Sequence, residues 1–195
     1  AMKQIAKSGK KILFVATKKQ AKGLVAEIAE SLNMPYITER WPGGLLTNFA
    51  TIRKSIKKMQ TIDKMKEDGT FDSLSKRERL QIDRQRAKLD LNLGSIVKMT
   101  RMPEAIFIVD TNKESIALAE ANKLAIRSFA MTDTNTNPNA VSFPIPSNDD
   151  ASKSIESILS VVSKAIAEGL EERGADQEMK ANEKKEKAKQ ISEEK

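Results

Sequence analysis

Residues 11–20 read KILFVATKKQ, an apolar run followed at once by a polar turn. The run shows no alternation of polar and apolar residues, which is typical of a strand buried on both faces of a sheet. After the turn, apolar residues recur at helical spacing as far as residue 32, and Asn33 and Pro35 then predict the end of a helix. This stretch therefore predicts a strand–turn–helix unit, with residues 17–20 spaced as a capping box.

The same alternation continues along the chain. We predict further strands at residues 36–37, 105–109, 127–131 and 142–145, a second capping box at 111–114, and helices over 111–124 and 147–166. Apolar strands that alternate with helices indicate an α/β fold, in which helices cover both faces of a parallel sheet.

Residues 47–99 do not fit this alternation and predict two long helices joined by residues 67–74 (EDGTFDSL). The second helix has a capping box at Ser75–Glu78. The first, of roughly 18 residues, is ~27 Å long at 1.5 Å per residue, so the pair is expected to protrude from the α/β body. The segment carries 13 basic and 7 acidic residues. One side of the first helix is apolar and is predicted to pack on the second helix through Ile82, Leu89 and Leu93.

The segment that leads into the first long helix, residues 39–48 (ERWPGGLLTN), contains the only Trp. Pro42 favours an extended backbone at Trp41, and Gly43 and Gly44 permit conformations closed to other residues. We interpret the segment as the joint between sheet and helical pair, with Asn48 or its neighbour capping the first helix. Two roles for the Trp remain open: packing in the joint, and contact with RNA.

Composition excludes several functions. The chain of 195 residues is 39% hydrophobic and 31% charged, and it contains neither Cys nor His, so disulfides, thiolate chemistry and histidine-based catalysis are ruled out. No apolar run approaches the ~18 residues that span a bilayer, and no membrane partner is expected. Residues 171–195 mix Glu and Lys with few large apolar residues, and we predict a disordered tail there.

The net charge of +7 is unevenly distributed, with 21 basic and 10 acidic residues in 1–100 but 13 and 17 in 101–195. A basic half favours a polyanionic partner. Because aromatic residues make up only 4% of the chain, recognition of structured RNA through backbone and shape fits better than stacking on single strands. Surface lysines that only contact solvent are the simpler alternative.

Acidic residues follow two predicted strands, at Asp110 and Asp133, and Asp149 and Asp150 open the last helix. They allow a second hypothesis, a doubly wound enzyme or binding module for a phosphorylated small molecule, with a carboxylate cluster for Mg²⁺. Asx-turns and helix-dipole pairing explain the same residues without a ligand. The strand–turn–helix junction at 15–20 (VATKKQ) lacks the glycines of a nucleotide site, so we expect no cofactor. A third hypothesis is a helical-arm adaptor that binds protein.

Several segments together resemble the bacterial small ribosomal subunit protein 2 family, in the family's order and across most of the chain. They include RWPGGLLTNFATIRKSIKKM, KMKEDGTF, LSKRERL, PEAIFIVDTNKESIALAEANKLAI and TDTNTNPNAVSFPIPSNDDA. The resemblance implies a flavodoxin-like or Rossmann-like domain (1–46 and 100–170) with an inserted antiparallel helical hairpin of coiled-coil type (47–99), followed by the tail (171–195).

The resemblance also implies a non-enzymatic, cytoplasmic ribosomal protein that binds 16S rRNA and other small-subunit proteins, among them the large OB-fold protein that captures mRNA. No metal and no small-molecule substrate are implied. From charge and resemblance together, the residues expected to bind RNA are Lys10, Lys11, Lys18, Lys19, Lys22, Arg40, Trp41, Gly43, Gly44, Asn48, Arg53, Lys54, Lys57 and Lys58.

Some residues depart from the family pattern. Members begin with a segment of the Gly-Val-His-Phe-Gly-His type, which residues 1–9 do not match, and the sheet is expected to lack a strand as a result. Ala125 and Arg127 replace the usual Gly and Pro, which leaves the strand at 127–131 less well supported, and Asn137 replaces Asp.

Overall fold

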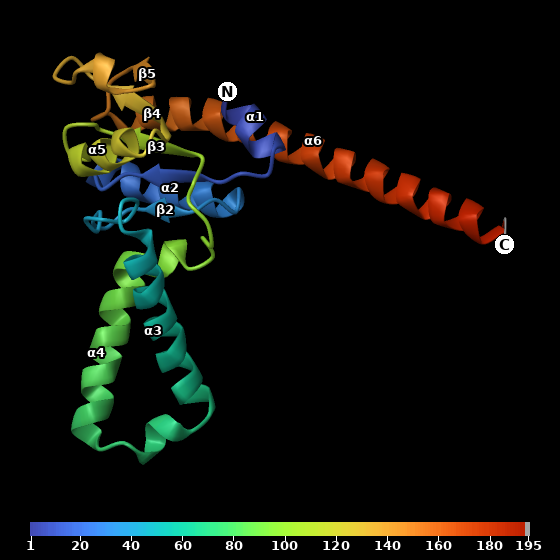
Figure 1. Cartoon of the computed structure of the whole chain (residues 1–195). Coiled ribbons are helices and arrows are strands. Elements are labelled where there is room, and N and C mark those ends of the chain that lie inside the picture. Colours follow the sequence, from blue (N-terminus) through green and yellow to red (C-terminus); the bar gives the residue numbers. More distant parts are fainter. Residues whose placement is uncertain (194–195) are drawn as a thin grey trace.

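A five-stranded parallel sheet forms the centre of the computed structural model, which describes the backbone of residues 1–193 and the side chains of residues 1–179 (Figure 1). Its strands are β1 (Ile12–Val15), β2 (Tyr36–Ile37), β3 (Ala105–Val109), β4 (Arg127–Thr132) and β5 (Phe143–Pro146). They lie in the order β2-β1-β3-β4-β5, and every pairing is parallel. This is the flavodoxin-like order, so the predicted α/β fold class is confirmed.

Six α-helices and three short 3₁₀ helices connect and cover the strands in the described part of the chain. The α-helices are α1 (Met2–Lys7), α2 (Lys19–Ser31), α3 (Phe49–Glu67), α4 (Lys76–Leu93), α5 (Ser115–Lys123) and α6 (Ser152–Glu193). The 3₁₀ helices are η1 (Thr70–Ser73), η2 (Gly94–Ile96) and η3 (Pro138–Ala140).

Both faces of the sheet are buried, which explains why its central strands are apolar without alternation. Ile12 and Phe14 belong to one hydrophobic cluster, together with apolar residues of α1, α2 and α6. Leu13 and Val15 belong to the other, which contains the turn around Trp41, the near ends of α3 and α4, and α5. Every residue of β1 and β3 is buried. Helices on both sides are therefore a requirement of this sequence.

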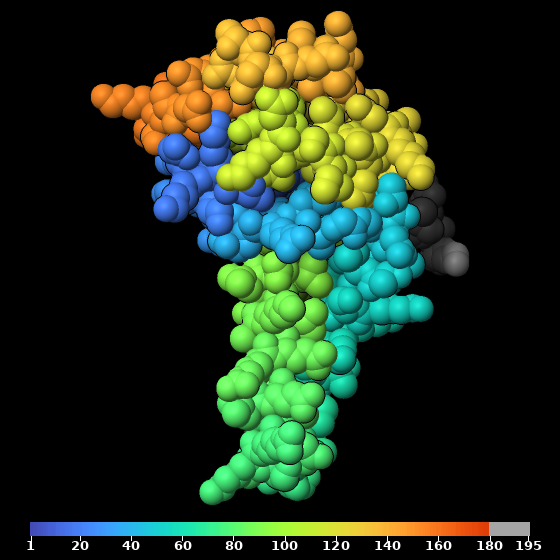
Figure 2. Space-filling view, turned by 90° about the vertical axis from the view of Figure 1, so that its left-hand side faces the viewer, coloured from blue at the N-terminus to red at the C-terminus, as the bar shows by residue number. Residues whose placement is uncertain are grey.

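The helices α3 and α4 extend together away from the sheet and are joined at their far ends through η1 (Figures 1 and 2). The predicted capping box at Ser75 and Glu78 is present. Arg86 of α4 donates to Asp63 of α3 at 2.9 Å. Of the predicted packing residues on α4, Leu93 is buried, while Ile82 and Leu89 are half-buried. Coiled-coil packing and a separate domain at 47–99 stay predictions.

The long helix α6 runs past the predicted end of that helix and past the predicted tail boundary at residue 171. Contacts with α1 explain the extension, because Lys3 lies 3.0 Å from Glu168 and 2.9 Å from Glu172. The helices approach closely at Gly169, where an added Cβ would lie 2.3 Å from the Lys3 carbonyl oxygen. The side chains of the rest of the predicted tail, from 180 onward, lie outside the described residues.

The strand β4 forms despite the departures at Ala125 and Arg127. Ala125 takes the turn before it with φ of +54°, a left-handed conformation that Gly adopts without strain.

We expect Ala125→Gly to raise the free energy of unfolding by roughly 1 kcal/mol, because it removes the left-handed penalty of an L residue. Urea denaturation would measure the change. Ala119→Gly, on the exposed face of α5, is the control and should lower stability by about 1 kcal/mol. If Ala125→Gly did not raise the free energy of unfolding, the left-handed conformation of Ala125 would not be strained.

Candidate nucleic-acid interface

The crevice at the carboxyl ends of β1 and β3 is where sheets of this order bind ligands. Here the Lys18 ammonium fills it, 2.8 Å from Asp149, 2.5 Å from Asp150 and 3.2 Å from Asp110. Burial alone would lower the pKa of Lys18, but hydrogen bonds to the three carboxylates outweigh it and raise that pKa. Because its side chain is only 15% exposed and its charge is matched, we do not carry Lys18 into the RNA interface.

Neighbouring groups close the same crevice. Glu114 is buried and accepts hydrogen bonds from the backbone N–H and the hydroxyl of Thr17. The capping boxes predicted at 17–20 and 111–114 are wrong: neither α2 nor α5 has a side-chain cap, and Thr17 and Glu114, one from each predicted box, bond to each other. Asp110 instead makes the Asx-turn, accepting from the N–H groups of Asn112 and Lys113 at 3.1 Å.

Carboxylate oxygens of Asp133, Asp149 and Asp150 lie within 4.8 Å of one another, a spacing that can hold a metal ion. Lys18 already supplies a positive charge to two of the three. A backbone hydrogen bond from Thr134 lowers the pKa of Asp133. We therefore interpret the cluster as an internal charge pairing.

We expect Lys18→Met to lower the free energy of unfolding by about 3 kcal/mol, because the carboxylates of Asp110, Asp149 and Asp150 would lose the cation that they share. Lys19→Met is the matched control, since the adjacent Lys19 is exposed, and it should leave stability unchanged. Equal stability of the two variants in urea denaturation would refute the pairing role.

The joint between sheet and helical pair is held by one buried carboxylate, that of Glu120 in α5. It accepts hydrogen bonds from the Trp41 indole N–H at 3.0 Å and from the backbone N–H groups of Gly44 at 2.7 Å, Leu46 at 3.0 Å and Thr47 at 3.1 Å. Gly44 has φ of +84°, as the Gly pair predicted. Burial alone would raise the pKa of Glu120, but these hydrogen bonds outweigh it and lower that pKa.

Sequence reasoning missed Glu120. Its signal was an acidic residue three positions after Ala117, on the buried face of α5. Trp41 is only 7% exposed and its one polar group is bonded to Glu120. The structure thus gives Trp41 a packing role, and we do not carry it into the RNA interface.

We expect Glu120→Gln to lower the free energy of unfolding by about 2 kcal/mol at neutral pH, because its amide would face N–H donors with an N–H of its own. A carboxyl group whose pKa is lower in the folded than in the unfolded state stabilises the fold at pH values above its unfolded pKa of about 4.3. This contribution is lost as the pH falls through the folded-state pKa. The difference between Glu120 and Gln should therefore shrink in acid.

Urea denaturation at neutral pH and near pH 3, well below the unfolded pKa, measures both effects. The control Glu27→Gln alters an exposed acid of α2 and should be neutral. A difference that stays constant with pH would count against the charged carboxylate.

The remaining basic residues divide into paired and unpaired. Lys10 pairs with Glu104 at 2.6 Å, Lys22 with Glu39 at 3.0 Å, and Lys11 donates to the Asn33 carbonyl at 2.6 Å. Arg53 turns inward and donates to the Met99 carbonyl at 3.3 Å. The exposed members without a carboxylate partner among the described residues are Lys19, Arg40, Lys54, Lys57 and Lys58.

Two other predicted residues precede α3 in the chain. Gly43 is exposed. Asn48 precedes the helix without a side-chain cap, so the predicted cap is wrong; its side chain accepts from the Thr51 hydroxyl at 2.8 Å. Both are accessible, and the exposed Lys54, Lys57 and Lys58 follow Asn48 within ten positions.

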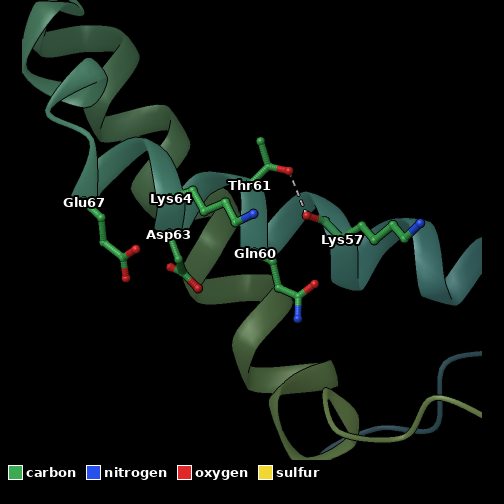
Figure 3. A pocket seen from close by; sticks show the side chains of 6 residues that line it. All are labelled: Lys57, Gln60, Thr61, Asp63, Lys64 and Glu67. Atoms are coloured by element: carbon green, nitrogen blue, oxygen red, sulfur yellow. Dashed lines mark hydrogen bonds between the residues drawn. The ribbon is translucent and has the colours of Figure 1, made fainter.

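A hollow of about 630 Å³ lies along α3, lined by residues of that helix alone (Figure 3). Lys57 and Lys64 line it together with Asp63 and Glu67. Since the two charges of each sign compensate, the hollow as a whole does not favour a polyanion. Lys57 lines the hollow and is also one of the exposed lysines of α3, while Lys54 and Lys58 lie outside it. No helix among the described residues is both long enough and apolar enough to cross a membrane.

The comparisons with known proteins show the family of the chain. A family model described as ribosomal protein S2 matches residues 1–169. The chain belongs to the ribosomal protein S2 family. Proteins named small ribosomal subunit protein uS2 are 64% identical over 94% of the chain in Flavobacterium johnsoniae, 66% over 90% in Phocaeicola vulgatus and 66% over 89% in Christiangramia forsetii. The chain spans 72%, 63% and 58% of their respective lengths.

Membership in the S2 family agrees with the expectation of a non-enzymatic protein, because the relatives carry the name of a ribosomal component. It leaves the enzyme hypothesis without support. Around Lys18, the crevice that this hypothesis would use is internally paired.

Proposed function

We propose that this chain is a structural component of the small ribosomal subunit, which binds 16S rRNA and neighbouring ribosomal proteins in the cytoplasm and supports translation. Family membership carries this proposal, together with relatives named for the small subunit at 64–66% identity. The proposal includes the large OB-fold mRNA-binding protein as a partner, on the resemblance alone.

The outer side of α3 is the strongest part of the proposed RNA interface. Lys54, Lys57 and Lys58 are exposed on one helix that extends from the body. None has a carboxylate partner among the described residues, so each can neutralise a phosphate and release a counterion. Arg40, Gly43 and Asn48 would extend this surface toward the joint. Recognition would read backbone and shape, since the single Trp is buried.

Replacing Lys54, Lys57 and Lys58 together with Glu should weaken binding to a 16S rRNA transcript by at least about tenfold and make its salt dependence shallower by about two units of slope. Filter binding over a range of KCl concentrations measures both quantities. Co-sedimentation with 30S subunits should fall in parallel.

The control replaces Lys123, Lys153 and Lys164 with Glu, which gives the same change in net charge at exposed positions of α5 and α6. It should retain most of the affinity. Binding of the α3 variant at the control's level would remove α3 from the interface, and failure of the unaltered chain to sediment with 30S subunits would overturn the proposal.

A further inference from the structure

A second basic site lies at the opposite end of the sheet from Lys18. A pocket of about 350 Å³ opens between residues 9–11, which lead into β1, and the loop 98–104, which leads into β3. Of the nine residues that line it, four are basic, namely Lys10, Lys11, Lys98 and Arg101. Sequence reasoning had singled out only the first two.

The positive charges of this pocket are only partly matched. Glu104 is the one acidic lining residue, and Lys10 already pairs with it at 2.6 Å, with Arg127 at 3.9 Å on its other oxygen. Lys98 and Arg101 are exposed and have no carboxylate partner among the described residues. The pocket therefore keeps a net positive charge.

A further cation, Arg173 of α6, lies at the edge of the pocket. Its guanidinium packs against Gly9, where an added Cβ would lie 2.4 Å from the guanidinium carbon. Burial lowers the pKa of Lys11, and the nearby charges of Arg173 and Lys98 lower it further. Cations gathered from three chain segments repel one another, and a bound anion would relieve that repulsion.

The pocket also adjoins the α3 surface. Arg53 of α3 donates to the Val97 carbonyl at 3.5 Å and the Met99 carbonyl at 3.3 Å, and so fixes the start of the loop that carries Lys98 and Arg101. Lys54 follows directly on the same helix. One RNA segment that contacts α3 would therefore find the pocket at the helix's near end.

We infer that this pocket is a binding site for a backbone phosphate of the RNA, in which Lys98 and Arg101 make the direct contacts while Lys11 and Arg173 supply the surrounding positive field. The inference rests on the proposed function and names a phosphate site at the base of α3. Arg101 is suited to two parallel hydrogen bonds to a phosphate, and Lys98 acts as a point charge.

The test is the double variant Lys98→Ala/Arg101→Ala in the full chain, with the 16S rRNA transcript as probe. Affinity should fall about tenfold, and the salt dependence should become shallower by about one to two units of slope. The charge-preserving variant Lys98→Arg/Arg101→Lys should keep the salt dependence of the unaltered chain, and its affinity should fall less than that of the alanine variant. The control Lys123→Ala/Lys153→Ala removes two exposed lysines elsewhere and should bind like the unaltered chain. Thermal melts should be equal for all, since every changed residue is exposed.

The outcomes separate the two proposals. If the unaltered chain binds and only the double variant weakens, the pocket is supported. If the double variant binds like the unaltered chain, or the control weakens equally, the pocket is refuted while the proposed function stands. If the unaltered chain does not bind rRNA, both are overturned.

Discussion

The Glu120 carboxylate holds the turn at 41–47 against α5. The sheet face that contains Leu13 and Val15 is covered in part by that turn. The apolar residues of β1 and β3 on this face are covered by Trp41, Leu45 and Leu46, together with the near ends of α3 and α4. The backbone N–H groups of this turn would not stay buried without partners, because unpaired backbone donors cost free energy. One acidic side chain satisfies three of these donors and the indole, so sheet, joint and helical pair are fixed by a single group.

The two ends of the sheet differ in electrostatics. At the carboxyl ends of the strands, Lys18 is surrounded by three carboxylates, and the crevice that related folds use for ligands is internally paired. At the amino ends, one carboxylate, Glu104, lies among several cations. Unpaired positive charge thus collects at the amino ends and on α3, the surfaces that we assign to RNA.

Much of the fold could be predicted from local patterns. The unbroken apolar strands required two covered faces, and the capping box at Ser75 gave the start of α4, because both signals lie within a few residues of sequence. Other local signals failed where a distant residue competed. Thr17 has the spacing of a cap but bonds Glu114, 97 positions away. The charged segment after residue 170 lacked apolar residues, yet its first turns are helical because Glu172 meets Lys3 and Lys7 of α1.

The candidate site follows the same division. By itself, the sequence determined the parallel sheet, the two long helices, the basic character of the first half and the family, since these depend on composition, periodicity and motif order. Only the tertiary structure decided which charges are available. Lys18 pairs with carboxylates inside the molecule, and Arg53 donates to a backbone carbonyl. Trp41 is buried. Lys98 and Arg101 line one pocket together with Lys11. The reason is physical: a charge is free or matched according to its neighbours in space, and those neighbours come from distant parts of the chain.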